Sequence, residues 1–256
     1  MTNLTDKPTA LVTGGATRLG FAFARALATA GFNIALHYHS STREAQKAAE
    51  SIRALGVSCD TFQCDLSEKE PQKLIERVFD QYPTLQVLIN SASAYDAATI
   101  AATSRACLEQ QFSVNFFAPF LLTSTFAEKC AQGNVINILD NKIAFQQNNY
   151  AAYLLSKKTL ESFTQLAAME FAPNIRVNAI APGVILPGTN RTNDYISWRI
   201  EGIPLKRQGA VDNLTQAMFY LLENGFITGQ TLTVDGGEGL HHQGQNAEQY
   251  PKRDLL

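Results

Sequence analysis

The sequence predicts an α/β protein with a Rossmann-type, doubly wound parallel sheet of seven strands and helices on both faces. We expect a single nucleotide-binding domain over residues 1–256. Between Ala10 and Val234, short apolar runs alternate with segments whose apolar residues recur at helical spacing, which is typical of βαβ units. No Pro/Ser/Gly-rich linker divides the chain, and its length is ordinary for one α/β sheet.

Seven short apolar runs are the expected strands. They are Ala10–Thr13, Asn33–Tyr38, Ser58–Asp65, Val87–Asn90, Asn134–Leu139, Ile175–Ile180 and Thr231–Val234. Ligands of parallel sheets bind outside the carboxyl ends of the strands. Six motif residues stand at these ends, so we expect one site there: Gly14, His37, Asp65, Asn90, Asp140 and Pro182.

A glycine-containing turn, Gly14–Gly20, joins the first expected strand to a helix expected over Phe21–Thr29. Backbone N–H groups and the positive end of a helix dipole attract phosphate, and glycine lets the backbone approach it closely. The G-x-G-x-x-G spacing itself is absent, because only Gly14, Gly15 and Gly20 are present. The turn therefore predicts a phosphate site, with a glycine turn that binds nothing as the alternative.

The end of the second strand indicates which nucleotide is bound. No carboxylate that could hold free ribose hydroxyls occurs between Gly31 and Arg43. The segment offers hydroxyls and partly cationic groups that suit a 2′-phosphate, as does Arg18 in the turn. We therefore expect NADPH rather than NADH, although a solvated loop is an alternative for the histidines. The residues concerned are His37, Tyr38, His39, Ser40 and Ser41.

Tyr153 and Lys157 are a candidate acid and its cationic neighbour. They stand four residues apart in a segment of helical periodicity, Tyr150–Met169, and so lie roughly 6 Å apart along one helix face. A fixed cation favours the phenolate, so we expect Lys157 to lower the tyrosine pKa towards neutrality. Chance occurrence in an amphipathic helix is the alternative when the pair is considered alone.

The motifs in order resemble the short-chain dehydrogenase/reductase family over essentially the whole chain. The resemblance rests on Thr13-Gly14 with Gly20, Asp65, Asn90-Ser91-Ala92-Ser93, Asn115, Tyr153-x-x-x-Lys157 and Pro182-Gly183. Three departures from the commonest pattern, Arg18, Ser93 and Asp140, coincide with the pteridine reductase subgroup. Asp140 stands thirteen residues before Tyr153, where the family usually has serine. Bacterial dihydromonapterin and dihydrofolate reductases are similar.

The resemblance implies roles for the matching residues. Tyr153 would be the proton donor, Lys157 would hold the nicotinamide ribose, and Asn115 would hold a water in a proton relay. Asp140 would serve the pterin, because a carboxyl beside Tyr153 can exchange a proton at a ring nitrogen. A capping role for Asp140 in an Asp-Asn turn stays open. The implied NADPH contacts are Gly14, Thr17, Arg18, Leu19, Gly20, His37, Tyr38, His39, Ser40, Ser41, Asp65, Leu66, Asn90, Ser91, Ala92, Tyr153, Lys157, Pro182, Gly183 and Val184.

The implied substrate is a pterin, a dihydropterin or a dihydrofolate. Tyr95 would stack on its ring, since offset stacking of aromatic rings is favourable. An ordinary loop tyrosine is the alternative, and Ser93 would contact either substrate or cofactor. The implied substrate contacts are Ser93, Tyr95, Asp140, Tyr153, Leu186, Pro187 and Trp198.

Two other functions fit the same motifs. One is reduction of ordinary carbonyl substrates such as a 3-oxoacyl thioester, against which Asp140 and Arg18 argue. The other is a catalytically silent nucleotide-binding regulatory protein, against which the complete set of Asn115, Tyr153 and Lys157 argues.

Two segments near the end of the chain lack clear periodicity. Residues 184–207 form a long connection without a long apolar run, which the resemblance implies is a substrate lid. Its Tyr195, Trp198 and Arg199 are candidates to wall a flat substrate, but a helix packing Ile196 and Ile200 inward is the simpler interpretation. Residues 238–256 read as a polar, mobile tail.

Composition excludes several partners. A net charge of −2 and scattered basic residues leave no footprint for nucleic acid. No apolar run approaches a membrane span and the start of the chain is polar, so we expect a cytoplasmic protein. The four cysteines, Cys59, Cys64, Cys107 and Cys130, lack C-x-x-C spacing, which favours reduced thiols and no metal site. The family resemblance implies a homotetramer.

Overall fold

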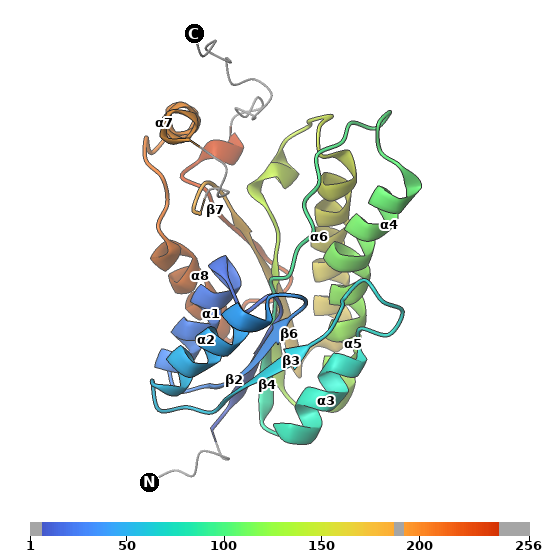
Figure 1. Cartoon of the computed structure of the whole chain (residues 1–256), viewed down its shortest axis with the longest axis vertical. Coiled ribbons are helices and arrows are strands. Elements are labelled where there is room, and N and C mark those ends of the chain that lie inside the picture. Colours follow the sequence, from blue (N-terminus) through green and yellow to red (C-terminus); the bar gives the residue numbers. More distant parts are fainter. Residues whose placement is uncertain (1–6, 187–191, 241–256) are drawn as a thin grey trace.

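The computed structural model describes residues 7–186 and 192–240. Within these residues, seven parallel strands form one sheet in the order β3-β2-β1-β4-β5-β6-β7. Figure 1 shows α1, α2 and α8 covering one face of this sheet, and α3, α5 and α6 covering the other. This is the doubly wound, three-layer architecture that the alternating apolar runs predict, so the fold class is confirmed.

The strands are β1 Thr9–Val12, β2 Asn33–Tyr38, β3 Cys59–Gln63, β4 Leu85–Asn90, β5 Gly133–Ile138, β6 Ile175–Pro182 and β7 Thr231–Val234. The helices are α1 Arg18–Thr29, α2 Thr42–Arg53, α3 Lys73–Gln81, α4 Arg105–Phe112, α5 Ala118–Lys129, α6 Ala151–Phe171, α7 Asn193–Glu201 and α8 Val211–Glu223. Three shorter turns of helix accompany them: the π-helical η2 Ser113–Phe117, and the 3₁₀ turns η3 Asn141–Ala144 and η4 Glu238–Leu240.

Alternation along the strands divides the core into two layers. In β1, Ala10 and Val12 pack under α1, α2 and α8, whereas Leu11 between them packs on the opposite face against α3, α5 and α6. Both faces of a parallel sheet are covered by helices, so every side chain of such a strand is buried. This explains why the strands read as continuous apolar runs rather than as alternating ones.

All seven predicted strands are present, with ends that differ by at most a few residues. One helix boundary is corrected: α1 begins at Arg18 rather than Phe21, so the glycine turn is shorter than predicted. Arg18 itself has a positive φ of 52°, so the backbone turns sharply at the first residue of α1. The strand order reverses between β1 and β4, and ligands of doubly wound sheets bind at this switch point.

Candidate active site

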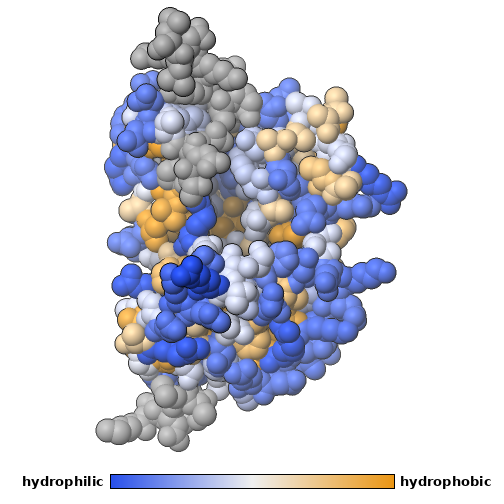
Figure 2. All heavy atoms as spheres, viewed as in Figure 1, coloured by the Kyte–Doolittle hydropathy of each residue, from blue (hydrophilic) through white to orange (hydrophobic). Residues whose placement is uncertain are grey.

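A cleft of about 730 Å³ lies at the carboxyl ends of the strands. Figure 2 shows the surface hollowed between the two sides of the molecule, with apolar atoms visible at depth. Most of the predicted site residues line it: Gly14, Thr17, Arg18, Leu19, Gly20, His37, His39, Asp65, Leu66, Ser91, Ala92, Ser93, Tyr95, Asp140, Tyr153, Lys157, Pro182, Gly183 and Leu186.

The turn after β1 is built so that backbone surrounds the start of α1. Gly14 has a φ of +63°, and a Cβ there would lie 3.0 Å from the Ala92 Cα. A Cβ on Gly20 would lie 2.2 Å from the Gly14 carbonyl oxygen, so only glycine fits. No side chain caps α1 at Thr17, and its first turn holds no acidic residue. The start of α1 is therefore suited to an anionic group.

His37 supports this turn rather than offering a charge to a phosphate. The Gly14 N–H donates to its Nδ1 at 3.1 Å, and its Nε2 lies 3.0 Å from the Cys64 carbonyl oxygen. Both ring nitrogens are thus used, with Nδ1 as acceptor and Nε2 as donor. Burial lowers the pKa of His37 to about 4. The expectation of a partly cationic His37 is wrong, because the ring is buried and neutral.

Other residues of the expected 2′-phosphate site lie near the mouth of the cleft. The Arg18 guanidinium is exposed and donates from Nη2 to the Leu186 carbonyl oxygen at 2.6 Å. The exposed His39 ring lies 3.4 Å from the Asp65 carboxylate. Ser67 donates to that carboxylate from its backbone and its hydroxyl, which holds the pKa of Asp65 below its usual value. Tyr38, Ser40 and Ser41 do not line the cleft.

Thr13 fixes the turn after β4. Its hydroxyl oxygen accepts hydrogen bonds from the backbone N–H groups of Ser91 and Ala92, at 2.9 and 3.0 Å. Asn90, expected to contact the cofactor, instead lies behind the cleft and donates to the buried Asn137 side chain at 2.8 Å. The Asn90 side chain thus supports the sheet, and its expected contact with the cofactor stays a prediction. The signal for the role of Thr13 in the sequence is its hydroxyl, which directly precedes the glycine turn.

Asn115 is fully buried in the π-helical turn η2 and holds the loop after β4. Its side-chain oxygen accepts from the Ala94 N–H, and its amide donates to the Ala94 carbonyl oxygen, both at 2.9 Å. The same amide donates to the Ser156 hydroxyl of α6 at 3.1 Å. Asn115 thus joins the loop that carries Ser93 and Tyr95 to the helix that carries Tyr153. Its expected water relay stays a prediction.

Tyr153 donates from its hydroxyl to Asp140 Oδ2 at 2.8 Å. Tyr153 lies in the first turn of α6 and Asp140 just after β5, so two elements aim the pair at the cleft. Burial and the Asp140 carboxylate raise the pKa of Tyr153 well above 10.0. A buried phenol beside a carboxylate is held in its protonated form. Tyr153 therefore carries its proton at neutral pH, and its expected role as proton donor stays a prediction.

Lys157 does not lower the tyrosine pKa in this arrangement, which corrects that expectation. Its ammonium donates to the Ile138 carbonyl oxygen at 2.8 Å and lies 5.9 Å from the centre of the Tyr153 ring. Burial lowers the pKa of Lys157 from 10.5 to about 8. The carboxylate acts on the phenol more directly than the ammonium does, since it is hydrogen-bonded to it.

The two carboxylate oxygens of Asp140 have different partners, and its expected role towards a pterin stays a prediction. Its Oδ1 accepts from the Lys142 N–H at 2.9 Å and caps the 3₁₀ turn η3, as the Asp-Asn pair indicates. Its Oδ2 faces Tyr153. One oxygen fixes the carboxylate on the backbone, which leaves the other oriented towards the cleft.

Tyr95 belongs to an aromatic cluster that packs against Tyr153. Its ring stacks on Tyr150 with centres 4.6 Å apart and meets Tyr153 edge-on at the same distance. Lys142 donates from Nζ to the Tyr95 hydroxyl at 2.9 Å and lies 4.9 Å from the centre of the Tyr150 ring. Tyr150 thus covers one face of Tyr95. The sequence interpretation missed Lys142, whose partners are distant in the chain.

Within the expected lid, residues 192–207 are described and contain α7. The expected helix is present as α7, but its buried positions are Tyr195 and Arg199, whereas Ile196 and Ile200 are half-buried. Trp198 packs against Tyr195, with ring centres 6.0 Å apart, and neither it nor Val184 lines the cleft. Pro187 lies outside the described residues.

The cleft also has walls that the sequence motifs did not indicate. They are Ala94, Gln110, Val114, Ile138, Leu139 and Ile185. Within residues 7–186 and 192–240, no group of three or more acidic, histidine or cysteine side chains is placed to hold a metal ion. Of the helices in those ranges, none is long and apolar enough to cross a membrane.

Comparison with known proteins agrees with this geometry. The profile of the family described as enoyl-(acyl carrier protein) reductase matches residues 14–238. The chain belongs to the short-chain dehydrogenase/reductase family, and it is an oxidoreductase of that family.

The relatives include one enzyme named for a 3-oxoacyl substrate and one named for dihydromonapterin. An uncharacterized oxidoreductase of Mycobacterium tuberculosis is 34% identical over 91% of this chain and 92% of its own length. A 3-oxoacyl-[acyl-carrier-protein] reductase of Staphylococcus epidermidis is 30% identical, with 89% and 97% covered. The dihydromonapterin reductase of an Enterobacter species is 29% identical, with 94% and 100% covered.

The solved structures that resemble this chain include an enzyme named as a dihydrofolate reductase. The alternative dihydrofolate reductase 1 of Brucella suis, in complex with NADP, has a TM-score of 0.88 and 31% identity, covering 94% of this chain and 98% of that one.

Proposed function

We propose that this protein is an NADPH-dependent reductase of pterin rings, with a pterin, a dihydropterin or a dihydrofolate as substrate. The observation that carries the proposal is the hydrogen bond from the Tyr153 hydroxyl to Asp140 Oδ2, 2.8 Å long and at the cleft wall. A carboxylate at this point suits a ring that presents amide and amino donors and a basic ring nitrogen.

The cleft fits a dinucleotide. Gly14 and Gly20 leave backbone at the start of α1 for a diphosphate, and Ala92 and Gly183 line the same cleft. Arg18 and His39 stand at the end where a 2′-phosphate would lie, and Lys157 lies deeper, where it would hold the nicotinamide ribose. Bound NADPH supplies a hydride to the carbon of a ring C=N bond.

The side chains supply the proton that balances this hydride. Burial and Asp140 keep the Tyr153 hydroxyl protonated at neutral pH, so it carries a proton that it can pass to the more basic nitrogen that forms as hydride arrives. As the nitrogen takes the proton, the Tyr153–Asp140 pair becomes one proton short and regains it from water. Direct delivery from water is the alternative route. A neutral Tyr153 phenol is a sufficient donor for a basic ring nitrogen, so Tyr153 does not have to ionise before the reaction.

Replacing Asp140 by serine tests the proposal. We expect Asp140→Ser to lower kcat on pterins by about 10²–10⁴-fold, the usual contribution of a positioned acid or base, and to leave NADPH affinity unchanged. Steady-state NADPH oxidation with biopterin, dihydrobiopterin, dihydromonapterin and dihydrofolate measures the first effect, and NADPH fluorescence measures the second. Asp80→Ser, at an exposed site of α3, is the matched control.

Full pterin turnover by Asp140→Ser would rule out the proposed role. Reduction of carbonyls is the rival function, because 3-oxoacyl thioesters are substrates named for one relative. A wild-type enzyme that reduces a 3-oxoacyl thioester but none of the four pterins would establish this rival. Absence of NADPH oxidation with every substrate would instead favour the silent regulatory protein.

We also propose that the protein is a homotetramer. Large apolar side chains are exposed along α4, η2, α5 and α6, and burying such a face between subunits is favourable. Sedimentation velocity at assay concentration should show a tetramer, and a monomer would contradict the proposal. The exposed residues are Leu108, Phe117, Phe120, Leu155, Leu166 and Met169.

A further inference from the structure

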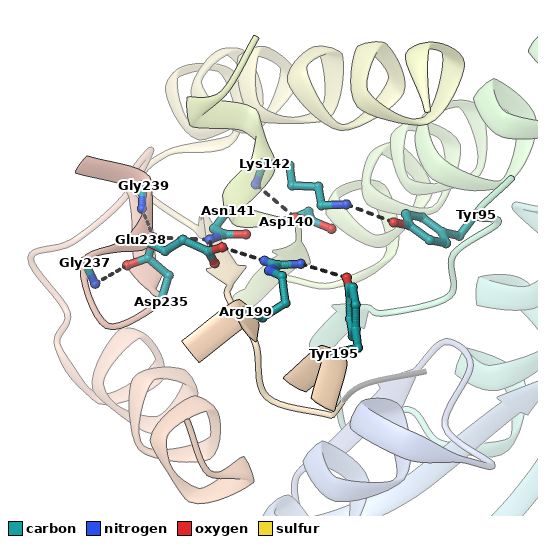
Figure 3. Close-up of polar contacts among 10 residues, drawn as sticks. All are labelled: Tyr95, Asp140, Asn141, Lys142, Tyr195, Arg199, Asp235, Gly237, Glu238 and Gly239. Carbon is teal, nitrogen blue, oxygen red and sulfur yellow. Dashed lines mark hydrogen bonds and ion pairs between the residues drawn. The ribbon is translucent and has the colours of Figure 1, made fainter. Parts of the chain in front are cut away.

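A buried ion pair joins α7 to the C-terminal turn η4. Arg199 Nη2 lies 2.5 Å from Glu238 Oε1, and the two side chains are 9% and 1% exposed. Figure 3 shows the guanidinium of Arg199 extended towards Glu238 on one side and Tyr195 on the other. The sequence interpretation placed Glu238 in a mobile polar tail, which is wrong, because this residue is buried and ordered into η4.

The second oxygen of the same carboxylate binds the catalytic turn. Asn141 donates from Nδ2 to Glu238 Oε2 at 2.8 Å, and Asn141 is the residue directly after Asp140. Asp235 presents Glu238 to both partners, since its carboxylate accepts from the backbone N–H groups of Gly237 and Gly239, at 2.8 and 2.6 Å. Glu238 therefore bridges α7 and η3 with one oxygen each (Figure 3).

The α7 end of this bridge continues to Tyr195. Arg199 Nη1 donates to the Tyr195 hydroxyl at 3.3 Å. A continuous path thus runs from Tyr195 through Arg199, Glu238 and Asn141 to the peptide that carries Asp140.

Stability is a weak explanation for this pair. Burying two charges costs several kcal/mol, and apolar residues of similar volume are often as stable. Here the guanidinium also leaves Nε buried without a hydrogen-bond partner among the described residues. An arrangement selected for stability would satisfy that donor.

We propose that Glu238 is a positioning residue, which couples the placement of α7 to the orientation of Asp140. The proposal rests on the proposed function, in which Asp140 acts on the pterin. When α7 is in place, Arg199 and Asn141 hold the two oxygens of Glu238, and η3 presents Asp140 to Tyr153. When α7 moves, η3 loses its contact with Glu238, and Asp140 is no longer held in a fixed orientation.

Glu238→Gln tests the coupling, because it keeps the volume and removes the charge. Hydrogen exchange without any substrate should become at least about tenfold faster in both residues 141–145 and residues 193–201, since local opening follows the loss of shared contacts. Exchange in α1 should not change. Glu201→Gln, an exposed glutamate of α7, is the matched control and should change neither segment. Faster exchange in only one segment, or in neither, would overturn the coupling.

Kinetics test the consequence for Asp140. We expect Glu238→Gln to lower kcat on pterin by up to about 10²-fold, as for a misplaced catalytic group, with an unchanged KM for NADPH. An increase in pterin KM with unchanged kcat would mean that Glu238 only holds α7, and would overturn the positioning role. If the wild type reduces no pterin, the proposed function fails, and the exchange experiment still decides the coupling.

A double variant covers the case in which Glu238→Gln does not fold. Arg199→Met with Glu238→Leu replaces the pair by apolar residues of similar size, which usually preserves folding. It lacks the bond to Asn141, so residues 141–145 should still exchange faster and kcat should stay low. Wild-type exchange and wild-type kcat in this folded variant would refute the proposal.

Discussion

The two ends of the cleft are held together by different interactions. At the β1–β3 end, polar side chains bind backbone: Thr13 accepts from two N–H groups, and His37 joins the glycine turn to β3. At the β5–β7 end, ionisable side chains bind one another, as in the Tyr153–Asp140 and Arg199–Glu238 pairs. At the first end the buried polar side chains are neutral and fix the backbone, which suits recognition. The second end holds ionisable groups that can exchange protons, which suits catalysis.

Burial has opposite uses at these two ends. It keeps His37 neutral, with a pKa of about 4, so that the ring serves as a fixed hydrogen-bonding bridge. It brings the pKa of Lys157 to about 8, close to a change of charge at neutral pH, and it keeps Tyr153 protonated beside Asp140. The same physical effect therefore makes one end inert and the other reactive.

Removing the Tyr153 hydroxyl tests the reactive end most directly. We expect Tyr153→Phe to lower kcat by about 10²–10⁴-fold, since the proton donor is lost. The fold should be unaffected, because the ring and its contact with Tyr95 are kept. Steady-state NADPH oxidation with the best pterin substrate measures the effect. Tyr220→Phe, at an exposed tyrosine of α8, is the matched control.

A Tyr153→Phe enzyme with near wild-type kcat would show that the proton comes from water. The comparison between the two ends would then change, because the β5–β7 end would bind substrate without supplying the acid.

His37 tests the inert end through the pH dependence of stability. Its pKa is lowered from 6.5 to about 4 on folding, so the unfolded chain binds the proton more tightly. The stability contributed by neutral His37 is complete above pH 6.5 and is lost as the pH falls towards 4. The loss is roughly 3 kcal/mol over that range. Urea unfolding between pH 4 and 7.5 should show this slope in the wild type.

His37→Gln should be less stable at pH 7 and should lose stability less steeply below pH 6.5. His39→Gln is the control, because that ring is exposed, and it should keep the wild-type slope. Equal slopes in the wild type and His37→Gln would mean that His37 is not held neutral, and the contrast between the two ends would lose its electrostatic basis.

The parts predicted from the sequence depend on contacts that are local or set by spacing. The seven strands follow from apolar runs, and Tyr153 and Lys157 lie together because one helix turn separates them. Asp140 was predicted to face Tyr153 from a family pattern, and the chain brings them together because both follow β5. The spacing alone did not show that Oδ1 would be used for the cap.

The errors share a physical cause, which is a partner far away in the chain. His37 reads as a loop cation until Cys64 and the Gly14 turn are placed beside it. Glu238 reads as the start of a tail until Arg199 and Asn141 supply its partners. Polar residues in irregular segments have no periodicity that records their burial, so their partners emerge only from the folded chain.

Arg18 gives the smallest expected effect and the sharpest test of what the β1–β3 end recognises. Its guanidinium is exposed, so a contact with a 2′-phosphate is screened by salt and contributes about 1 kcal/mol. We expect Arg18→Ala to lower kcat/KM for NADPH by about fivefold to tenfold and to leave NADH unchanged, with a smaller difference at high salt. Arg25→Ala, at an exposed arginine of α1, is the control. An unchanged NADPH/NADH preference would remove Arg18 from the cofactor site. Its bond to the Leu186 carbonyl oxygen would then be its whole function, linking the turn after β1 to the segment after β6.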